Sequence, residues 1–386
     1  MLDKLKRFNW IMFAAMGLLV AVGTVAIWSA GNARAELVFH GMWMNNLTTA
    51  AFGLVLYLLL AFADYRKVLD FMSWPAYAVS LLLLVAVLLF GSTVYGGRRW
   101  LWFFQPSELA KLCVIMLVAH VFGRASAWRV GFRGFAFAAA LVGLPAVLIL
   151  LEPDLGTTLT LVPAVLVMLF VARVWRTGLL VSFGVVGIVA LAVLGAVYEA
   201  ERPGTGPERR ERILRFVPLK DHQVKRVRVF LFPEEDAAGA GYNLRQSKIS
   251  IGSGGFTGKG IGKGETNHLK YLPQAISMND FIFCVYAEET GFVGSLALLA
   301  LFGCLLLPGC WVAFVSRDGR GRLLALGIST LVFAHVYINI AMSIGLVPIT
   351  GLPLPFISSG RTFLVTVMAG LGIIQSVSMH REDKRG

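Results

Sequence analysis

The chain contains ten continuous apolar stretches, most of them about twenty residues long. As an α-helix, a stretch of this length crosses the hydrocarbon core of a bilayer, whereas a membrane β-strand needs only about ten residues of alternating character. Backbone polar groups find no water there, so only helices and closed barrels satisfy them. The sequence therefore predicts an all-α polytopic membrane protein with about ten transmembrane helices. The predicted spans are residues 8–30, 47–63, 74–90, 107–122, 135–151, 157–172, 178–198, 281–307, 323–346 and 362–378.

The composition agrees with a protein whose main solvent is lipid. Hydrophobic residues make up 57% of the chain and charged residues only 15%, against roughly 45–50% and 25% in soluble domains. The formal charge of +13 raises the question of nucleic acid, but the placement of the basic residues argues for membrane topology instead. The four cysteines all lie within apolar stretches without metal-ligand spacing, so they are interpreted as small buried hydrophobes.

Basic residues alternate between the two sets of short connections. Cytoplasmic loops are enriched in Lys and Arg, so the richer set predicts that both termini lie in the cytoplasm. The richer set holds Lys4, Lys6, Arg7, Arg66, Lys67, Arg124, Arg129, Arg133, Arg173, Arg176, Arg317, Arg320, Arg322, Arg381, Lys384 and Arg385. The poorer set holds Arg34, Arg98, Arg99 and Arg361.

This topology divides the chain into three parts. Residues 1–198 carry the first seven spans, residues 199–279 form one long extracytoplasmic loop, and residues 280–386 carry the last three spans and a cytoplasmic tail. The loop holds fourteen Lys or Arg and nine Asp or Glu; long loops translocate largely regardless of charge. Its basic, amphipathic first half is typical of a segment on a membrane surface.

Asp280 is the strongest single candidate for chemistry, because it stands where the long loop enters the eighth span. One interpretation is structural, with the carboxylate capping the helix that follows. The other is functional, with Asp280 acting as a base at the membrane surface toward a substrate held by the loop.

Glu108 and Lys111 lie three residues apart at the predicted outer end of the fourth span, after Pro106 and Ser107, which suit a helix start. Charges within a span normally face the bundle interior or a wet cavity. They predict either a structural ion pair or an outward-opening polar cavity, which we prefer.

Three other features carry weaker signals. Asp154 either caps the sixth span or takes part in chemistry, and Arg99 either binds phosphate or is a solvated surface residue.

The glycine-dense stretch from Gly252 to Gly264 does not fit a P-loop, because Ser253 occupies a required glycine position and Gly260 replaces the Ser or Thr after Lys259. With Lys248, Lys259 and Lys263 it suits an external loop that folds over an anionic lipid headgroup.

In this order and spacing, the motifs resemble the SEDS (shape, elongation, division, sporulation) family of peptidoglycan glycosyltransferases, the RodA/FtsW family, and its RodA-like members more closely. The resemblance covers nearly the whole chain. The matching stretches are Arg99-Trp100, Gln105 to Lys111, Glu152 to Thr157, Gly241 to Asn243, Gln246 to Ile249, Gly252 to Gly255, Asp280 to Phe283, Ala287 to Gly291 and Gly351 to Ser358.

The resemblance implies a multi-pass protein of the bacterial cytoplasmic membrane that polymerises lipid II, an undecaprenyl-pyrophosphate-linked disaccharide, into glycan strands for cell elongation and shape. It implies that Asp280 is essential, and that a class B penicillin-binding protein with transpeptidase activity is the partner. A divalent cation such as Mg²⁺ or Mn²⁺ is expected to help neutralise the pyrophosphate, with its ligands unknown and no organic cofactor expected. The chain departs from the family pattern at Gln274 to Asn279, at Ser359 to Thr362, and in a shorter linker from Trp100 to Gln105.

These observations give one mechanistic hypothesis and two alternatives. Asp280 takes the proton of the acceptor hydroxyl, and Lys111, Arg99 and Lys248 stabilise the departing pyrophosphate, with Glu108 orienting Lys111. A single attack implies inversion at the anomeric carbon. The alternatives are a transporter that flips lipid II across the membrane, and a non-catalytic scaffold that recruits cell-wall synthases.

Overall fold

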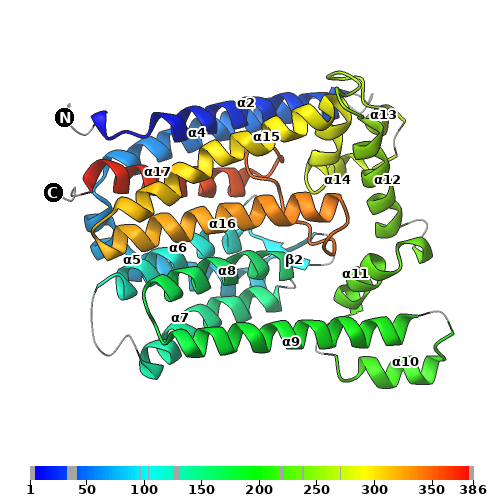
Figure 1. The fold of residues 1–386 in the computed structure, drawn as a ribbon, viewed down its shortest axis with the longest axis horizontal. Helices are drawn as coiled ribbons and strands as arrows, with labels where there is room; N and C mark the ends of the chain where they lie inside the picture. The colour runs from blue at the N-terminus through cyan, green and yellow to red at the C-terminus, as the bar shows by residue number, and fades with distance from the viewer. Residues whose placement is uncertain are drawn as a thin grey trace.

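The computed structural model describes residues 5–32, 41–94, 97–102, 104–124, 131–152, 154–202, 204–217, 219, 221–236, 239–269 and 271–381. Residues Lys4, Arg34, Arg129, Pro153, Lys384 and Arg385, which entered the sequence predictions, lie outside these ranges. Within them the protein is a helical bundle whose two termini lie at the same end, with the short helices between α9 and α15 gathered at the opposite end (Figure 1). We call these the terminal end and the far end.

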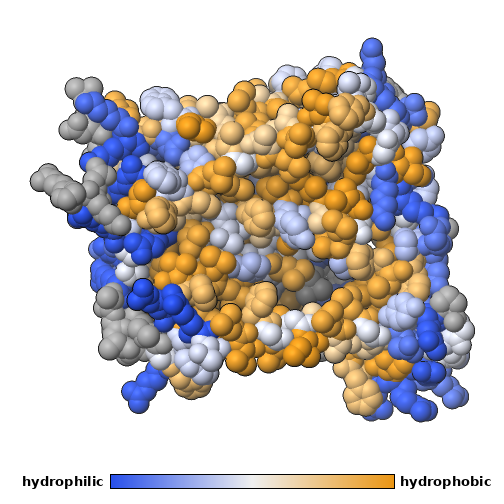
Figure 2. Space-filling model, viewed as in Figure 1, coloured by the Kyte–Doolittle hydropathy of each residue, from blue (hydrophilic) through white to orange (hydrophobic). Residues whose placement is uncertain are grey.

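A helix occupies each of the ten predicted spans. The ten are α2 (Trp10–Asn32), α4 (Met42–Phe62), α5 (Tyr65–Phe90), α6 (Pro106–Phe122), α7 (Phe132–Leu151), α8 (Leu155–Val171), α9 (Arg176–Glu201), α15 (Ile282–Val315), α16 (Gly319–Ser343) and α17 (Arg361–His380). Eight are long and apolar enough to cross a membrane, while α6 and α8 have 17 residues each. Hydrophobic side chains cover the middle of the molecule and hydrophilic ones its two ends (Figure 2), as expected for a multi-pass membrane protein.

The helices differ strongly in how deeply they are packed. Within the 18-residue apolar segment of α17, 89% of the residues are buried inside the protein, whereas only 6% are buried in the corresponding segment of α9. The central helices α16 and α17 therefore form the core of the bundle. Because α9 is apolar all round yet barely packed, its side chains face the lipid. It lies along one edge of the bundle (Figure 1).

The stretch from 199 to 279 contains several short helices. They are α10 (Pro207–Leu214), α11 (Asp221–Leu231), the 3₁₀ helix η2 (Pro233–Glu235), α12 (Ala240–Ser253), α13 (Glu265–His268) and α14 (Gln274–Met278). At the same end, strands β1 (Ser92–Val94) and β2 (Gly97–Trp100) form an antiparallel hairpin ahead of α6. The amphipathic helix α11 does not lie free on a surface, because it packs on α9, η2 and α12.

The glycine-dense stretch is inserted into a break in α15. Gly291 has φ 68° and ψ −164°, a backbone conformation that side-chain-bearing residues rarely adopt. The opened backbone pairs with the loop: the amides of Lys259 and Gly260 donate to the carbonyls of Glu288 and Glu289, 3.0 and 2.9 Å away. Gly258 has φ +80°, and a Cβ there would lie 2.1 Å from the Glu289 carbonyl oxygen. The loop is thus fixed to α15, and Lys259 pairs with Glu288 at 2.8 Å; its contact with a lipid headgroup stays a prediction.

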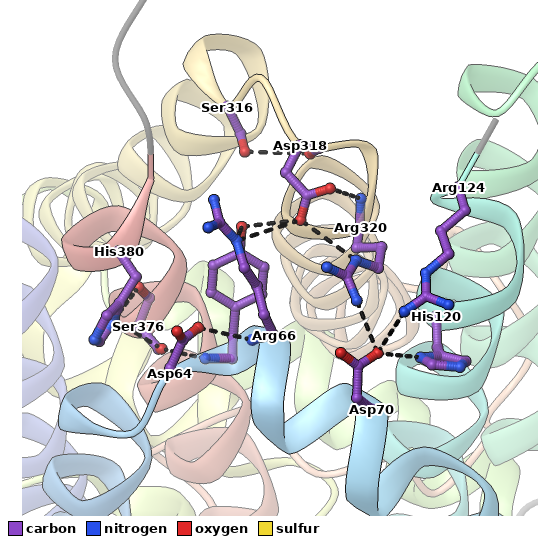
Figure 3. A network of polar contacts seen from close by, with 11 residues as sticks. Asp64, Arg66, Asp70, His120, Arg124, Ser316, Asp318, Arg320, Ser376 and His380 are labelled. Atoms are coloured by element: carbon purple, nitrogen blue, oxygen red, sulfur yellow. Dashed lines mark hydrogen bonds and ion pairs between the residues drawn. The ribbon is translucent and has the colours of Figure 1, made fainter.

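At the terminal end, Asp70 joins three helices (Figure 3). Its Oδ1 accepts hydrogen bonds from Arg124, just after α6, at 2.7 Å and from Arg320 of α16 at 2.9 Å. The Nδ1 of His120 lies 3.6 Å from the same oxygen. A single carboxylate of α5 therefore holds together the ends of α5, α6 and α16.

Replacing Asp70 with Asn should lower the stability of the bundle, because the amide loses the charge that two guanidinium groups share. The side chain is 48% exposed, so the loss should be about 1 kcal/mol and should shrink as salt concentration rises. Thermal unfolding in detergent at low and high salt measures it. Glu234→Gln is the matched control, since that 77% exposed side chain pairs with Arg245 at the surface; an equal shift in both variants would contradict the prediction.

Candidate active site

Asp280 lies in the short connection between α14 and α15, and its main chain is held from two sides. The Nδ2 of Asn339, from α16, donates to the Asp280 carbonyl at 3.0 Å and to the Leu352 carbonyl at 2.7 Å. The N-cap of α15 is Phe281, without a side-chain capping bond. The structural interpretation of Asp280 as a helix cap is therefore wrong, and its carboxylate remains available to a ligand.

The carboxylate opens into a cavity of about 550 Å³ at the far end, which we call the outer cleft. Its walls come from parts of the chain that are distant in sequence: β2, the ends of α6 and α8, α11, the residues around Asp280, and the stretch from 351 to 363. The elements β2, α11 and α14 lie together at that end of the bundle (Figure 1). The charged residues in the lining are Arg99, Glu108, Asp154, Arg226 and Asp280.

Two arginines face the two aspartates across this cleft. Arg226 donates from Nη1 to the Thr350 carbonyl at 2.9 Å, and Arg99 Nη1 lies 3.9 Å from Asp154 Oδ1. A Cβ on Gly351 would lie 3.5 Å from Asp280 Oδ2 and 4.0 Å from Arg226 Nη2, so both groups approach the same point. Burial raises the pKa of Asp280 to about 6, although Arg226 and Arg99 oppose the shift. Burial and the nearby Arg99 lower the pKa of Arg226.

Asp154 serves as a cap and as a partner for Arg99. It is the N-cap of α8, where its Oδ1 accepts from the Thr157 amide at 3.1 Å, and its Oδ2 accepts from Gln105 at 3.1 Å. The sequence prediction of a capping role is therefore confirmed. Because these donors and Arg99 surround both oxygens, Asp154 is less suited than Asp280 to remove a proton.

Glu108 and Lys111 form the predicted ion pair on α6, with 2.9 Å between Glu108 Oε2 and Lys111 Nζ. Lys111 Nζ also lies 2.8 Å from Nε2 of His335, on α16. Glu108 lines the outer cleft, whereas the side chain of Lys111 is only 1% exposed and lies behind it. Lys111 can therefore act on a ligand only by orienting Glu108 or through the electrostatic field of its positive charge.

The structure thus places the predicted substrate-binding residues in different positions. Arg99 and Glu108 line the outer cleft with Asp280, but Lys111 and Lys248 do not. Lys248 is exposed on α12 and packs against Gly345. The binding roles of all four stay predictions.

Arg226 was not among the candidates from the sequence. Its neighbours Lys225 and Arg228 gave the segment a basic, amphipathic pattern that was interpreted as a membrane-surface helix. The pattern correctly indicates a helix with one covered face, but it does not reveal that this face packs on the protein and that Arg226 lines the outer cleft. Only the folding back of α11 onto the bundle places Arg226 there.

Two of the stretches that depart from the family pattern, Gln274 to Asn279 and Ser359 to Thr362, meet beside Asp280. Ser358 donates to the Asn279 carbonyl at 2.6 Å, and the amide of Ser359 donates to the Met278 carbonyl at 3.2 Å. Asn279, Ser359 and Thr362 all line the outer cleft. The departures therefore form one wall of the site instead of lying scattered over the surface.

Comparison with known proteins gives consistent matches over the whole length. The family model of cell cycle proteins named FtsW/RodA/SpoVE matches residues 9–383. The peptidoglycan glycosyltransferase MrdB of Escherichia coli K12 is 35% identical, over 98% of this chain and 95% of its own. The peptidoglycan glycosyltransferase RodA of Treponema pallidum is 29% identical, over 96% and 97%.

Solved structures match as well. A chain from a structure describing coordination of polymerization and crosslinking by a peptidoglycan synthase complex aligns with a TM-score of 0.75 and 29% identity, over 97% of this chain and 99% of that one. The rod shape determining protein RodA of Thermus thermophilus aligns with a TM-score of 0.67 and 28% identity, over 98% of each chain.

Glu108→Gln should destabilise the protein strongly, because it leaves the buried ammonium of Lys111 without its counter-ion. Breaking one partner of a buried pair costs about 3–5 kcal/mol, whereas replacing both with apolar groups is often nearly neutral. Thermal unfolding should therefore show a large loss for the single variant and a smaller one for Glu108→Leu combined with Lys111→Met. A double variant no more stable than the single one would contradict this account.

Proposed function

The chain belongs to the FtsW/RodA/SpoVE family of cell cycle proteins, and from this premise we propose that it polymerises lipid II into glycan strands for cell elongation and shape. It is a multi-pass membrane protein and a peptidoglycan glycosyltransferase, as its relatives are named. The observation that carries the proposal is the outer cleft, where Asp280 faces the same space as Arg99 and Arg226. A base and two cations in one cleft suit transfer from a diphosphate donor to a hydroxyl.

Asp280 is the proposed general base. A sugar hydroxyl is a poor nucleophile near neutral pH, and a positioned base that takes its proton typically contributes a factor of 10²–10⁴. The pKa of about 6 for Asp280 leaves the carboxylate ionised at pH 7 while making it a stronger base than an exposed aspartate. Its main chain is held by Asn339, which limits how far the carboxylate can move.

Arg99 and Arg226 are the proposed binders of the departing pyrophosphate. Negative charge grows on the leaving group as the bond breaks, and fixed cations stabilise it best where water is scarce. Arginine presents a planar fork that matches phosphate oxygens. Because Arg99 disfavours the charge of Arg226, a dianion placed between them relieves that repulsion.

The geometry favours a single displacement. Asp154 is surrounded by the Thr157 amide, Gln105 and Arg99, so it is poorly placed to attack the sugar as a second nucleophilic carboxylate. Direct attack by the acceptor hydroxyl inverts the anomeric carbon. An α-linked lipid donor would then give a β-linked glycan.

A divalent cation is proposed only as a companion of the substrate. Among the described residues there is no group of three or more His, Cys, Asp or Glu side chains that could hold a metal ion, so the side chains of the cleft do not fit a resident metal. The ion would therefore enter with the pyrophosphate.

The site is proposed to face the outside of the cytoplasmic membrane, with both termini inside. The support is the charge distribution of the loops, because Arg7, Arg66, Arg320 and Arg381 stand at the ends of α2, α5, α16 and α17 that carry the basic short connections. We also propose a class B penicillin-binding protein as the partner, supported by the structural match to a chain from a peptidoglycan synthase complex.

A lipid II flippase and a non-catalytic scaffold remain the alternatives. The charged residues of the cleft gather at one end of the bundle, which favours chemistry at one surface over passage through the membrane. Purified protein, with its partner, incubated with lipid II in vesicles separates the three. A polymerase makes long glycan, a flippase moves lipid between leaflets, and a scaffold does neither.

Asp280→Asn should reduce glycan polymerisation by about 10²–10⁴ while the protein remains folded, because the amide cannot accept the proton. In the unaltered protein, activity should rise with pH through about 6 as the carboxylate ionises. Gel analysis of glycan made from lipid II measures both effects. Normal polymer from the variant would remove the base assignment.

Arg226→Gln should weaken binding of the donor pyrophosphate by about ten- to a hundredfold, because a charged hydrogen bond contributes roughly 1.5–3 kcal/mol. Titration with inorganic pyrophosphate and the KM for lipid II measure the loss. The control is Arg209→Gln, since Arg209 is 63% exposed and pairs with Glu199 away from the cleft. Unchanged affinity in Arg226→Gln would show that the guanidinium does not contact the leaving group.

A further inference from the structure

Three carboxylates and two cations lie in or beside the Arg99 wall of the outer cleft. Glu108 pairs with Lys111 at 2.9 Å, and Asp154 lies 3.9 Å from Arg99. Glu152, at the end of α7, is the third carboxylate and has no comparable partner. Glu152 is 0% exposed, and neither of its carboxylate oxygens has a hydrogen-bond partner in the described part of the chain.

This arrangement balances its charges only when Glu152 is neutral. With Glu152 protonated, two carboxylates face two cations; with Glu152 ionised, a third negative charge is buried without a donor, which is strongly disfavoured. Burial and the neighbouring Asp154 raise the pKa of Glu152 to about 8, while Arg99 opposes the shift. The carboxylic acid is therefore the main form at pH 7.

The neutral form matters because of how Arg99 is held. Arg99 Nε donates to the main-chain carbonyl of Glu152 at 3.4 Å, and its Nη1 points toward Asp154. The main-chain carbonyl of Glu152 thus fixes the Nε end of the Arg99 guanidinium group beside the cleft. A negatively charged Glu152 side chain would compete with a ligand for the same guanidinium.

We propose that Glu152 is a positioning residue: as a neutral acid it lets Arg99 reach a diphosphate group in the outer cleft, and as a carboxylate it draws Arg99 back. The inference rests on the proposed function in one respect, that the diphosphate belongs to the lipid donor. The charged groups that act on Glu152 are Asp154 and Arg99, and Glu108, paired with Lys111, lines the same cleft. Asp280 and Arg226 lie across the cleft, and Asp280 is already ionised above pH 7.

The first test is binding of inorganic pyrophosphate to the full-length protein in detergent at pH 7 and pH 9. With a pKa near 8, the neutral fraction of Glu152 falls about tenfold over this range, so affinity should fall about tenfold. In Glu152→Gln, whose amide cannot ionise, affinity should change less than about twofold relative to the titration of pyrophosphate itself. Equal pH dependence in both proteins would overturn the proposal.

The second test is the pH profile of glycan polymerisation. Glu152→Gln should match the unaltered protein at pH 7 and should retain activity at pH 9, where the unaltered protein loses about nine-tenths. Thermal unfolding checks that the variant is folded. A folded variant that is inactive at pH 7 would overturn the proposal, because it would mean that the ionised form is required.

Glu201→Gln is the matched control. Glu201 is also a buried glutamate at a helix end, with a 3% exposed side chain, but it pairs with Arg210 at 2.7 Å. It should show the same pH dependence as the unaltered protein. If the unaltered protein makes no glycan at any pH, the proposed function is wrong, and the pyrophosphate titration still decides the role of Glu152.

Discussion

The side-chain amide of Asn339 is the interaction on which the outer cleft depends most directly. It bonds the carbonyls of Asp280 and Leu352, and so ties the start of α15 to the stretch that leads into α17. Asn339 is itself 0% exposed, in the core helix α16. A buried amide with two carbonyl acceptors leaves little freedom, so a core helix of the bundle sets the position of the proposed base.

The same constraint explains how the protein distributes its charges. A charge inside a bilayer or a tight bundle is costly without a partner. The charges along the spans accordingly come as matched contacts, such as Lys111 with Glu108 at the far end and Asp70 with Arg320 at the terminal end. The outer cleft is different, because Arg226 is held by a neutral carbonyl and not by a carboxylate. That incomplete pairing makes the cleft attractive to an anion.

The sequence could predict those features that depend on local pattern. Ten apolar stretches predicted ten helices, Pro106 marked the start of α6, and Asp154 was correctly considered a cap. It could not predict features that depend on which segments meet. Arg226 reaches the cleft because α11 folds back, and Lys248 lies elsewhere because α12 presents it to solvent. Asp280 had been considered as a helix cap on position alone, yet the N-cap of α15 is the next residue.

The walls of the cleft are tied to the bundle to different degrees. The Asp280 wall, formed by the residues around Asp280, is bound to α16 through Asn339. The glycine-dense stretch that precedes it in the chain is inserted into the break in α15 at Gly291. The Arg226 wall is joined to the Asp280 side by the bond to Thr350, and α11 otherwise packs on η2, α12 and the lightly packed α9. A diphosphate held by both arginines would connect the looser wall to the firmer one. Substrate binding would then complete the site by holding Arg226 and Arg99 at a fixed separation, which is the arrangement that charge stabilisation of the leaving group requires.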